Sequence, residues 1–346
     1  MRVLLLFIFV VTACGTADQK RPITIEKVDL GVEVDSPYPK LLSEWDLFEM
    51  PMRTLTPKGE RTFPYELNSP LFSDYASKAR FIRLPAEGIM GYHSSEVLEF
   101  PIGTVLIKNF YYPADFRNPE GNKRVMETRL LIREQEDWHG IVYEWNDEQT
   151  DAKRLILGKK KDVSWVDRHG TLQRINYAIP SQPQCKSCHD LNGKMTPIGP
   201  SVRQLNRDDQ LLTWRDKGWI DLPDEELPQL GSYEDEKSSL DDRARAWLEI
   251  NCAHCHRREG PAKNSGLYLL ASQPDSYRLG VKKPPIAAGK GSGGLKYSIV
   301  PGHPEQSILV HRIQSLESGE MMPEVGRAMK HEEGIALISA WITQME

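Results

Sequence analysis

The sequence predicts an α+β protein of several domains, in which an antiparallel β-sandwich or barrel-like domain precedes an all-α domain. Two observations predict this order. Residues 41–180 contain five strand-like segments with turn residues between them, and residues 239–346 contain two segments with apolar residues at helical spacing. The chain has 346 residues, which is enough for domains with separate hydrophobic cores.

The first 13 residues have the pattern of a secretory signal peptide. An apolar run at residues 3–11 follows Arg2 and is too short to span a bilayer. The run leads into "VTAC", which resembles the lipobox of bacterial lipoproteins. Cys14 is therefore predicted to become the acylated first residue of the mature chain. The alternative is a signal peptide cleaved nearby, which would leave Cys14 as a free thiol. Gly15 after this cysteine favours the outer membrane. Residues 14–40, with alternating charge and prolines, are predicted to form a tether.

Strands are predicted throughout residues 41–180. The clearest segments are "TVLIKNFYY" from Thr104, "RVMETRLLIRE" from Arg124, "GIVYEWNDEQ" from Gly140, "AKRLILG" from Ala152 and "QRINYAIP" from Gln173. In the last of these, Ile175, Tyr177 and Ile179 share one face, as in a half-buried strand. The segments "NPEGNK" and "DRHG" supply residues typical of tight turns. This region is therefore predicted to be an antiparallel sandwich or a partly closed barrel.

Two helices are predicted in residues 239–346. Ser239 is suited to cap the first helix, with Asp242 three residues later in a pattern like a capping box. The second helix lies in "HEEGIALISAWITQME", where one face carries an apolar stripe of Ile335, Ile338, Trp341, Ile342 and Met345.

The cysteines are the most informative residues. Four of the five form two Cys-x-x-Cys-His motifs: Cys185, Cys188 and His189, then Cys252, Cys255 and His256. Zinc and disulfides are alternatives, but zinc-ribbon pairs lie about 15–20 residues apart. The histidine after each pair is the attachment signature of c-type haem, because two thiols one turn apart reach the two vinyl groups and the histidine binds the iron. The sequence therefore predicts two covalent haems, with His189 and His256 as axial ligands.

The order helix, haem motif, final helix is that of a small class I cytochrome c, so residues 239–346 are predicted to be an all-α domain of that type. Met322, which precedes Pro323, is its predicted sixth ligand, ahead of Met321. For the first haem the nearest soft ligand is Met195. Its competitors are His93, His139 and His169, whereas His254, His303 and His311 are predicted to be surface or loop residues. Residues 181–238 are predicted to be a haem-binding segment and linker.

Several stretches resemble a family of di-haem c-type cytochromes from Gram-negative bacteria. They are "YELNSPLFSDYASKARFIRLP" from Tyr65, "FPIGTVLIKNFYY" from Phe100, "METRLLIREQEDWHGIVYEWNDEQTDA" from Met126, "CKSCH" with "PIGPSVRQLN", and the C-terminal part. This resemblance implies two haems and an envelope location, without implying a reaction. Residues 97–152 also resemble, more weakly, the β-rich haem proteins related to cytochrome P460.

The predicted function is single-electron transfer between envelope redox proteins, with the lipid on Cys14 as the tie to the membrane and with the protein facing the periplasm or the cell exterior. The alternatives are a peroxidase-like di-haem oxidoreductase with an open first haem, and a partner- or glycan-binding β-domain that presents Trp138, Trp145 and Trp165. The formal net charge of −5 gives no indication of nucleic-acid binding.

Overall fold

The computed structural model describes residues 36–286 and 288–346. The chain divides into Met1–Tyr38 and a compact unit, Pro39–Glu346, and the second unit contains all the elements described below. The predicted signal peptide, Cys14 and residues 14–35 of the predicted tether lie outside the described residues. In the described part of the chain, no helix is long and apolar enough to cross a membrane.

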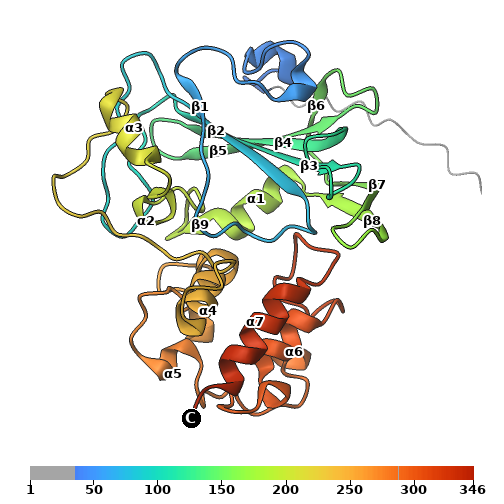
Figure 1. Ribbon diagram of the computed structural model, residues 1–346, viewed down its shortest axis with the longest axis vertical. Coiled ribbons are helices and arrows are strands. Elements are labelled where there is room, and N and C mark those ends of the chain that lie inside the picture. Colours follow the sequence, from blue (N-terminus) through green and yellow to red (C-terminus); the bar gives the residue numbers. More distant parts are fainter. Residues whose placement is uncertain (1–35, 287) are drawn as a thin grey trace, which may run out of the picture. The chain divides into compact units, whose positions relative to one another are not determined.

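The main sheet is an antiparallel meander of six strands that pair in sequence order (Figure 1). Its strands are β1 (Thr62–Pro64), β2 (Ser77–Arg83), β3 (Val105–Pro113), β4 (Lys123–Arg133), β5 (Trp138–Trp145) and β6 (Ala152–Leu155). A separate hairpin follows, made of β7 (Lys159–Val166) and β8 (Leu172–Ile179), and two short strands, β9 (Asp190–Leu191) and β10 (Lys194–Met195), pair with each other.

The two faces of the meander differ in chemistry. On one face, Phe81, Ile107, Leu130 and Ile141 lie opposite one another across four strands. This apolar row is buried by the segment before the sheet, where Phe48 contacts Phe81 with 5.6 Å between ring centroids. That segment contains the 3-10 helices η1 (Leu42–Trp45) and η2 (Met52–Thr54). The other face is contacted by α1 (Gln182–His189) and packs against the β7–β8 hairpin.

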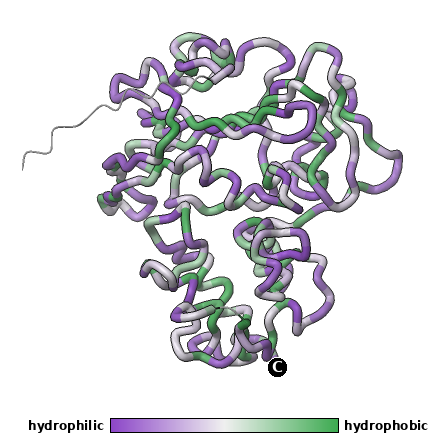
Figure 2. The backbone as a smooth tube through the Cα atoms, turned by 180° about the vertical axis from the view of Figure 1, so that it is seen from behind, coloured by the Kyte–Doolittle hydropathy of each residue, from purple (hydrophilic) through white to green (hydrophobic). Residues whose placement is uncertain are grey.

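The remaining helices follow the sheet in sequence. They are α2 (Val202–Leu205), α3 (Gln210–Asp216), α4 (Leu240–Leu248), α5 (Ser276–Leu279), α6 (Ile308–Gln314) and α7 (Glu332–Thr343). Short 3-10 or π turns complete the chain: η3 (Glu249–Ala253), η4 (Lys263–Ser265), η5 (Gly289–Ser292) and η6 (Pro304–Gln306). Figure 2 shows hydrophobic residues concentrated along the strands of the sheet and along the helices near the C-terminus.

The five strands and two helices predicted from local patterns are confirmed. Ser239 caps α4, and its side chain accepts a hydrogen bond from the backbone N–H of Asp242 at 3.1 Å. In α7 the predicted stripe is buried at Ile335, Ile338, Trp341 and Ile342. The strands β2 and β7 were not predicted, because "SKARFIR" and "KKKDVSWV" place lysines and arginines where an apolar alternation would be expected.

The predicted fold class is wrong. The first part is a single six-stranded sheet with a hairpin, instead of a sandwich or barrel, and residues 239–346 are not an all-α class I cytochrome c-like domain. The seven α-helices of the described chain have only 4 to 12 residues each. Helices this short are marginally stable in isolation and depend on packing against other elements. Accordingly, Trp247 of α4 and Ile338 of α7 belong to the same hydrophobic cluster as Ile82 and Leu106 of the sheet.

Candidate cofactor site

The first Cys-x-x-Cys-His motif lies on α1. This helix begins after Ser181, whose backbone N–H donates to the Gln184 side chain at 2.8 Å in a capping box. Cys185 and Cys188 are three residues apart on one helix, so both thiols lie on the same face. The helix approaches β5 at Gly140, where a Cβ atom would lie only 3.3 Å from the Cβ of Cys185. A glycine therefore allows the first motif to lie close against the sheet.

The second motif follows α4 through the π-helical turn η3. Asn251, directly before Cys252, holds this turn from both sides. Its side-chain nitrogen donates to the Trp247 carbonyl at 2.9 Å, and its side-chain oxygen accepts from the Phe72 N–H at 3.0 Å. Burial of Cys252 raises the pKa of its thiol to about 12. The turn thus places the first cysteine of this motif in the core.

The two motifs meet in the folded chain. The Sγ atom of Cys255 lies 4.0 Å from the carbonyl oxygen of Ser187, inside the first motif. The Cys255 thiol and the His254 ring both hydrogen-bond to Cys188 and lower the pKa of the Cys188 thiol. The four cysteines of the motifs are free thiols in the structure. The fold therefore brings together two motifs that are far apart in the sequence.

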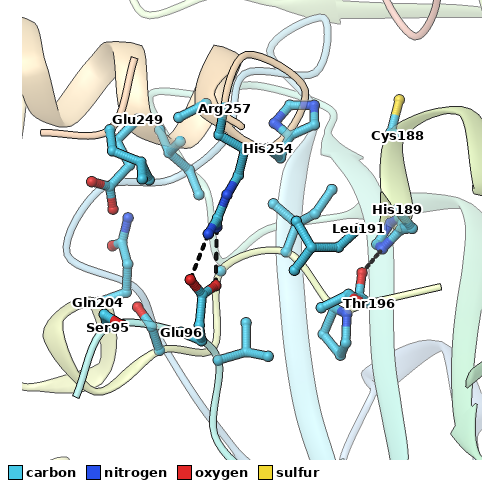
Figure 3. A pocket seen from close by; sticks show the side chains of 18 of the residues that line it. Ser95, Glu96, Cys188, His189, Leu191, Thr196, Gln204, Glu249, His254 and Arg257 are labelled. Atoms are coloured by element: carbon cyan, nitrogen blue, oxygen red, sulfur yellow. Dashed lines mark hydrogen bonds and ion pairs between the residues drawn. The ribbon is translucent and has the colours of Figure 1, made fainter. Parts of the chain in front are cut away.

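A cavity of about 260 Å³ adjoins both motifs. Most of the residues that line it are apolar, and Cys185, Cys188, Cys252, His189 and Met322 are among them. Cys255, His256 and Met195 are not in its lining. A smaller cavity of about 90 Å³ lies beside it and shares Cys188, His189 and His254 (Figure 3). An apolar cavity that opens onto paired cysteines has the character of a cofactor site.

The two motif histidines are held in the same tautomer. Nδ1 of His189 lies 2.8 Å from the Thr196 carbonyl oxygen, which can only accept, so Nδ1 carries the proton (Figure 3). Nδ1 of His256 lies 3.1 Å from the Ser265 hydroxyl, whose own hydrogen is donated to the Ala262 carbonyl. In both rings the Nε2 lone pair is thus available to bind a metal. This arrangement, with the other ring nitrogen donating to a protein acceptor, is typical of metal-binding histidines, and the residues present fit a covalent haem.

The two methionines predicted as sixth ligands have different positions. Met322 lines the large cavity, and its backbone N–H donates to the Arg312 carbonyl at 3.0 Å. Met195 lies on β10 directly opposite Asp190 of β9, the residue after His189. This register keeps Met195 beside its own motif histidine, whereas a sixth ligand must approach the opposite side of the haem.

The other histidines named from the sequence take separate positions. His303 is exposed, as predicted, and lies 3.2 Å from Glu305. His254, in the turn after η3, and His311, on α6, are half-buried, and each has a buried ring nitrogen without a hydrogen-bond partner among the described residues. His93 accepts backbone hydrogen bonds from a turn, His139 lies 2.9 Å from the Gln182 side chain, and His169 is exposed.

His331 was missed by the sequence analysis. It lies just before α7, lines the cavity and stacks on Phe72 with 4.4 Å between ring centroids. The Trp247 indole donates to its Nδ1 at 2.9 Å, so the proton of the neutral ring is on Nε2. Burial lowers the pKa of His331 to about 4, which keeps the ring neutral at pH 7. In this tautomer the ring has no free lone pair at Nε2, and it therefore serves to position the cavity wall.

The segment Asn68–Tyr75 joins the two halves of the site. Phe72 donates to Asn251 beside the second motif, as described above. The carboxylate of Asp74 accepts hydrogen bonds from the backbone N–H groups of Ala328 and Met329, at 2.8 to 2.9 Å. The hydroxyl of Tyr75 donates to Glu333 at 2.8 Å. The stretch "NSPLFSDY" thus fixes both the second motif and the loop that carries Met322.

An ion pair also links the second motif to the loop before β3. Arg257, the residue after His256, binds the carboxylate of Glu96 with two hydrogen bonds of 2.9 and 2.5 Å (Figure 3). These bonds hold the pKa of Glu96 below its usual range. Paired charges of this kind, partly shielded from water, stabilise a fold more than freely exposed pairs do.

We expect Glu96→Gln to lower the free energy of unfolding by about 1 kcal/mol at pH 7. A carboxylate with a lowered folded-state pKa contributes stability above its unfolded pKa of about 4.3 and loses it as the pH falls through the folded value. The difference between variant and parent should therefore shrink below about pH 4, measured by denaturant unfolding. Asp46→Asn removes an exposed pair with Lys58 and should leave stability unchanged. A difference in the free energy of unfolding that stays constant at all pH values would contradict a role for the charge of Glu96.

No family model matches the sequence, no curated protein matches it and no solved structure matches the fold. Among the described residues, no group of three or more His, Cys, Asp or Glu side chains converges as on a bare metal ion. The function must therefore be inferred from the two motifs, the cavity and their contacts.

Proposed function

We propose that this protein is a c-type cytochrome that carries two covalent haems and transfers single electrons between redox partners in the cell envelope. The supporting sequence feature is the pair of Cys-x-x-Cys-His motifs. The observation that carries the proposal is the contact between these motifs, at Cys255 and Ser187, and their shared cavity. Haems attached at neighbouring sites can exchange electrons directly.

Each haem would be held by residues already described. Cys185 and Cys188 bind one, and Cys252 and Cys255 bind the other. His189 and His256 would each bind an iron through Nε2, because Nδ1 of each ring is held by the Thr196 carbonyl or the Ser265 hydroxyl. Met322 would supply the second ligand of the iron at the second motif, a ligation that raises the reduction potential. Bound haem would supply one-electron chemistry, and most of the residues that line the cavity are apolar.

The envelope location is part of this proposal. It depends on the lipobox-like sequence before Cys14, whose acyl chains would hold the protein at a membrane, the outer membrane being favoured by Gly15. The partner is proposed to be another envelope redox protein or a dehydrogenase. Palmitate labelling of the parent chain and of Cys14→Ser tests the anchor: label retained by Cys14→Ser would contradict it.

The haem proposal is tested on protein matured in a host with c-haem assembly machinery. We expect covalent haem in a ratio of two per chain in the pyridine haemochrome assay, and reversible couples on an electrode. Low-temperature electron paramagnetic resonance should give two low-spin signals if both irons have six ligands. A chain without covalent haem, or without a reversible couple, would contradict the proposal.

A second function is favoured by the position of Met195. Because the β9–β10 register holds this methionine beside His189, the first haem would have an open coordination position. The protein would then be a peroxidase-like oxidoreductase whose second haem relays electrons. Carbon monoxide added to the reduced protein separates the two functions: a shifted spectrum at one haem favours the enzyme, and an unchanged spectrum favours the electron carrier.

The third hypothesis, an aromatic binding platform, is not supported by the tryptophans chosen for it. Trp145 is 0% exposed and Trp165 is 2% exposed. Trp138 is half-buried and contacts Phe100, with 5.5 Å between ring centroids. Trp145 and Trp165 therefore pack in the interior and are not available to a partner or glycan, and only Trp138 keeps part of its ring exposed.

A further inference from the structure

A row of positive charges crosses the sheet on the face that α1 covers. Arg80 on β2 lies directly opposite Lys108 on β3, and Lys108 lies directly opposite Arg129 on β4. Side chains opposite one another in a ladder are roughly 5 Å apart at Cβ, and like charges there are destabilising. All three residues line the large cavity. The sheet would be more stable with apolar residues here, as in the row beginning at Phe81 on its other face.

Carboxylates neutralise only part of this row. Buried Glu127 accepts two hydrogen bonds from Arg129, at 2.8 and 2.6 Å. Arg80 is 4% exposed; its Nη1 lies 3.3 Å from Glu66, but its Nη2 is buried with no hydrogen-bond partner in the described chain. Lys108 forms no ion pair with any described residue, and its Nζ lies 5.0 Å from the centroid of the Phe110 ring. Lys108 and one arm of Arg80 are thus left without a counter-charge.

The cavity contains no carboxylate of its own. Among the described residues, neither Asp nor Glu lines it, whereas four cations do: Arg80, Lys108, Arg129 and Arg327. Burial and the neighbouring cations hold the pKa of Lys108 well below its usual range, as expected for an ammonium group without a partner. An anionic group inside the cavity would supply the charge that this wall lacks.

The row faces the first motif. Gly140 of β5 lies opposite Leu131, which is two residues from Arg129 and therefore on the same face of β4. A Cβ atom at Gly140 would lie 3.5 Å from the Sγ atom of Cys185. A planar group attached to Cys185 and Cys188 would therefore lie beside the row, in the cavity that both cysteines and the row line.

We propose that Arg80 and Lys108 bind a propionate carboxylate of the haem attached at Cys185 and Cys188. Arg80 offers its free Nη2–H group and Lys108 its ammonium, and together they suit one carboxylate. This inference depends on the proposed function, because it requires a haem at the first motif. The haemochrome assay separates the two: a chain without covalent haem refutes the function, and a chain with both haems allows the row to be tested by itself.

The test combines two changes. Lys108→Met removes the charge and keeps a side chain of similar length, and Cys185→Ala with Cys188→Ala removes the first haem. We expect Lys108→Met to lower the Tm of the chain with both haems by roughly 2–4 °C, and to raise the Tm of the chain without the first haem by a similar amount. The control, Lys160→Met at an exposed site on β7, should leave the Tm of both chains unchanged. A shift of the same sign in both backgrounds would overturn the proposal.

A second readout does not depend on stability. In the chain that carries only the first haem, obtained with Cys252→Ala and Cys255→Ala, Lys108→Met should shift the reduction potential to a more negative value, because a nearby positive charge favours the reduced state. A potential equal to that of Lys160→Met would overturn the proposal. The proposal would also be overturned if added inorganic phosphate shifted the reduction potential of the parent but not that of Lys108→Met. The row would then bind an exchangeable anion.

Discussion

Replacing Cys185 and Cys188 together with alanine should lower the covalent haem content from two per chain to one, and the same pair of replacements at Cys252 and Cys255 should have the same effect. Each pair supplies both thioether bonds of a single haem in the proposed function. The loss should therefore come in whole haems, measured by the pyridine haemochrome assay with protein concentration from amino-acid analysis. Combining all four replacements should remove covalent haem completely.

Cys14→Ser is the matched control for these replacements, because Cys14 is the fifth cysteine and lies outside both motifs. It should retain two haems per chain. The contact between Cys255 and Ser187 adds a further expectation. If the two haems are neighbours, removing one should shift the reduction potential of the other, and voltammetry of each variant should detect this. Unchanged haem content after either pair of replacements would show that the motif does not bind haem.

The local patterns of the sequence predicted five of the strands and two of the helices correctly. The strands around Ile107, Leu130 and Ile141 contain short apolar runs, and α7 has a continuous apolar stripe, so the local pattern and the burial agree. β2 was missed because the positions of Lys78 and Arg80, which a packed sheet would fill with apolar residues, are charged. Because Arg80 lines the cavity, its failure to fit the pattern is itself a sign of the site.

The fold class was wrong for a different reason. The helix, motif, helix order around Cys252 is a local pattern, and it contains no information on what the helices pack against. In the structure Trp247 and Ile338 share their hydrophobic cluster with the sheet. The contact between the two motifs was also beyond the sequence, because it depends on long-range bonds such as Phe72 to Asn251 and Glu96 to Arg257. No periodicity in one segment indicates such partners.

Asp74→Ala should lower the free energy of unfolding by about 3 kcal/mol, and it should disturb the second haem selectively. The Asp74 side chain holds the loop after Met322 through the N–H groups of Ala328 and Met329. Burial raises the pKa of Asp74, and the hydrogen bonds from Ala328 and Met329, together with the charge of nearby Arg327, oppose the rise. Without these hydrogen bonds Met322 loses its fixed position.

The spectroscopic result distinguishes this effect from general destabilisation. We expect the near-infrared band of methionine-bound haem to weaken, with a new high-spin signal from the second haem and no change at the first. Asp74 has a φ of 50°, so part of the loss is backbone strain in alanine. Asp46→Ala is the control for that part, because Asp46 has a φ of 52° and an exposed carboxylate. The contrary result is that Asp74→Ala and Asp46→Ala lower the free energy of unfolding equally and both keep the methionine band. In that case the Asp74 carboxylate does not hold the Met322 loop. The position of Met322 must then depend on the hydrogen bond from its backbone N–H to the Arg312 carbonyl.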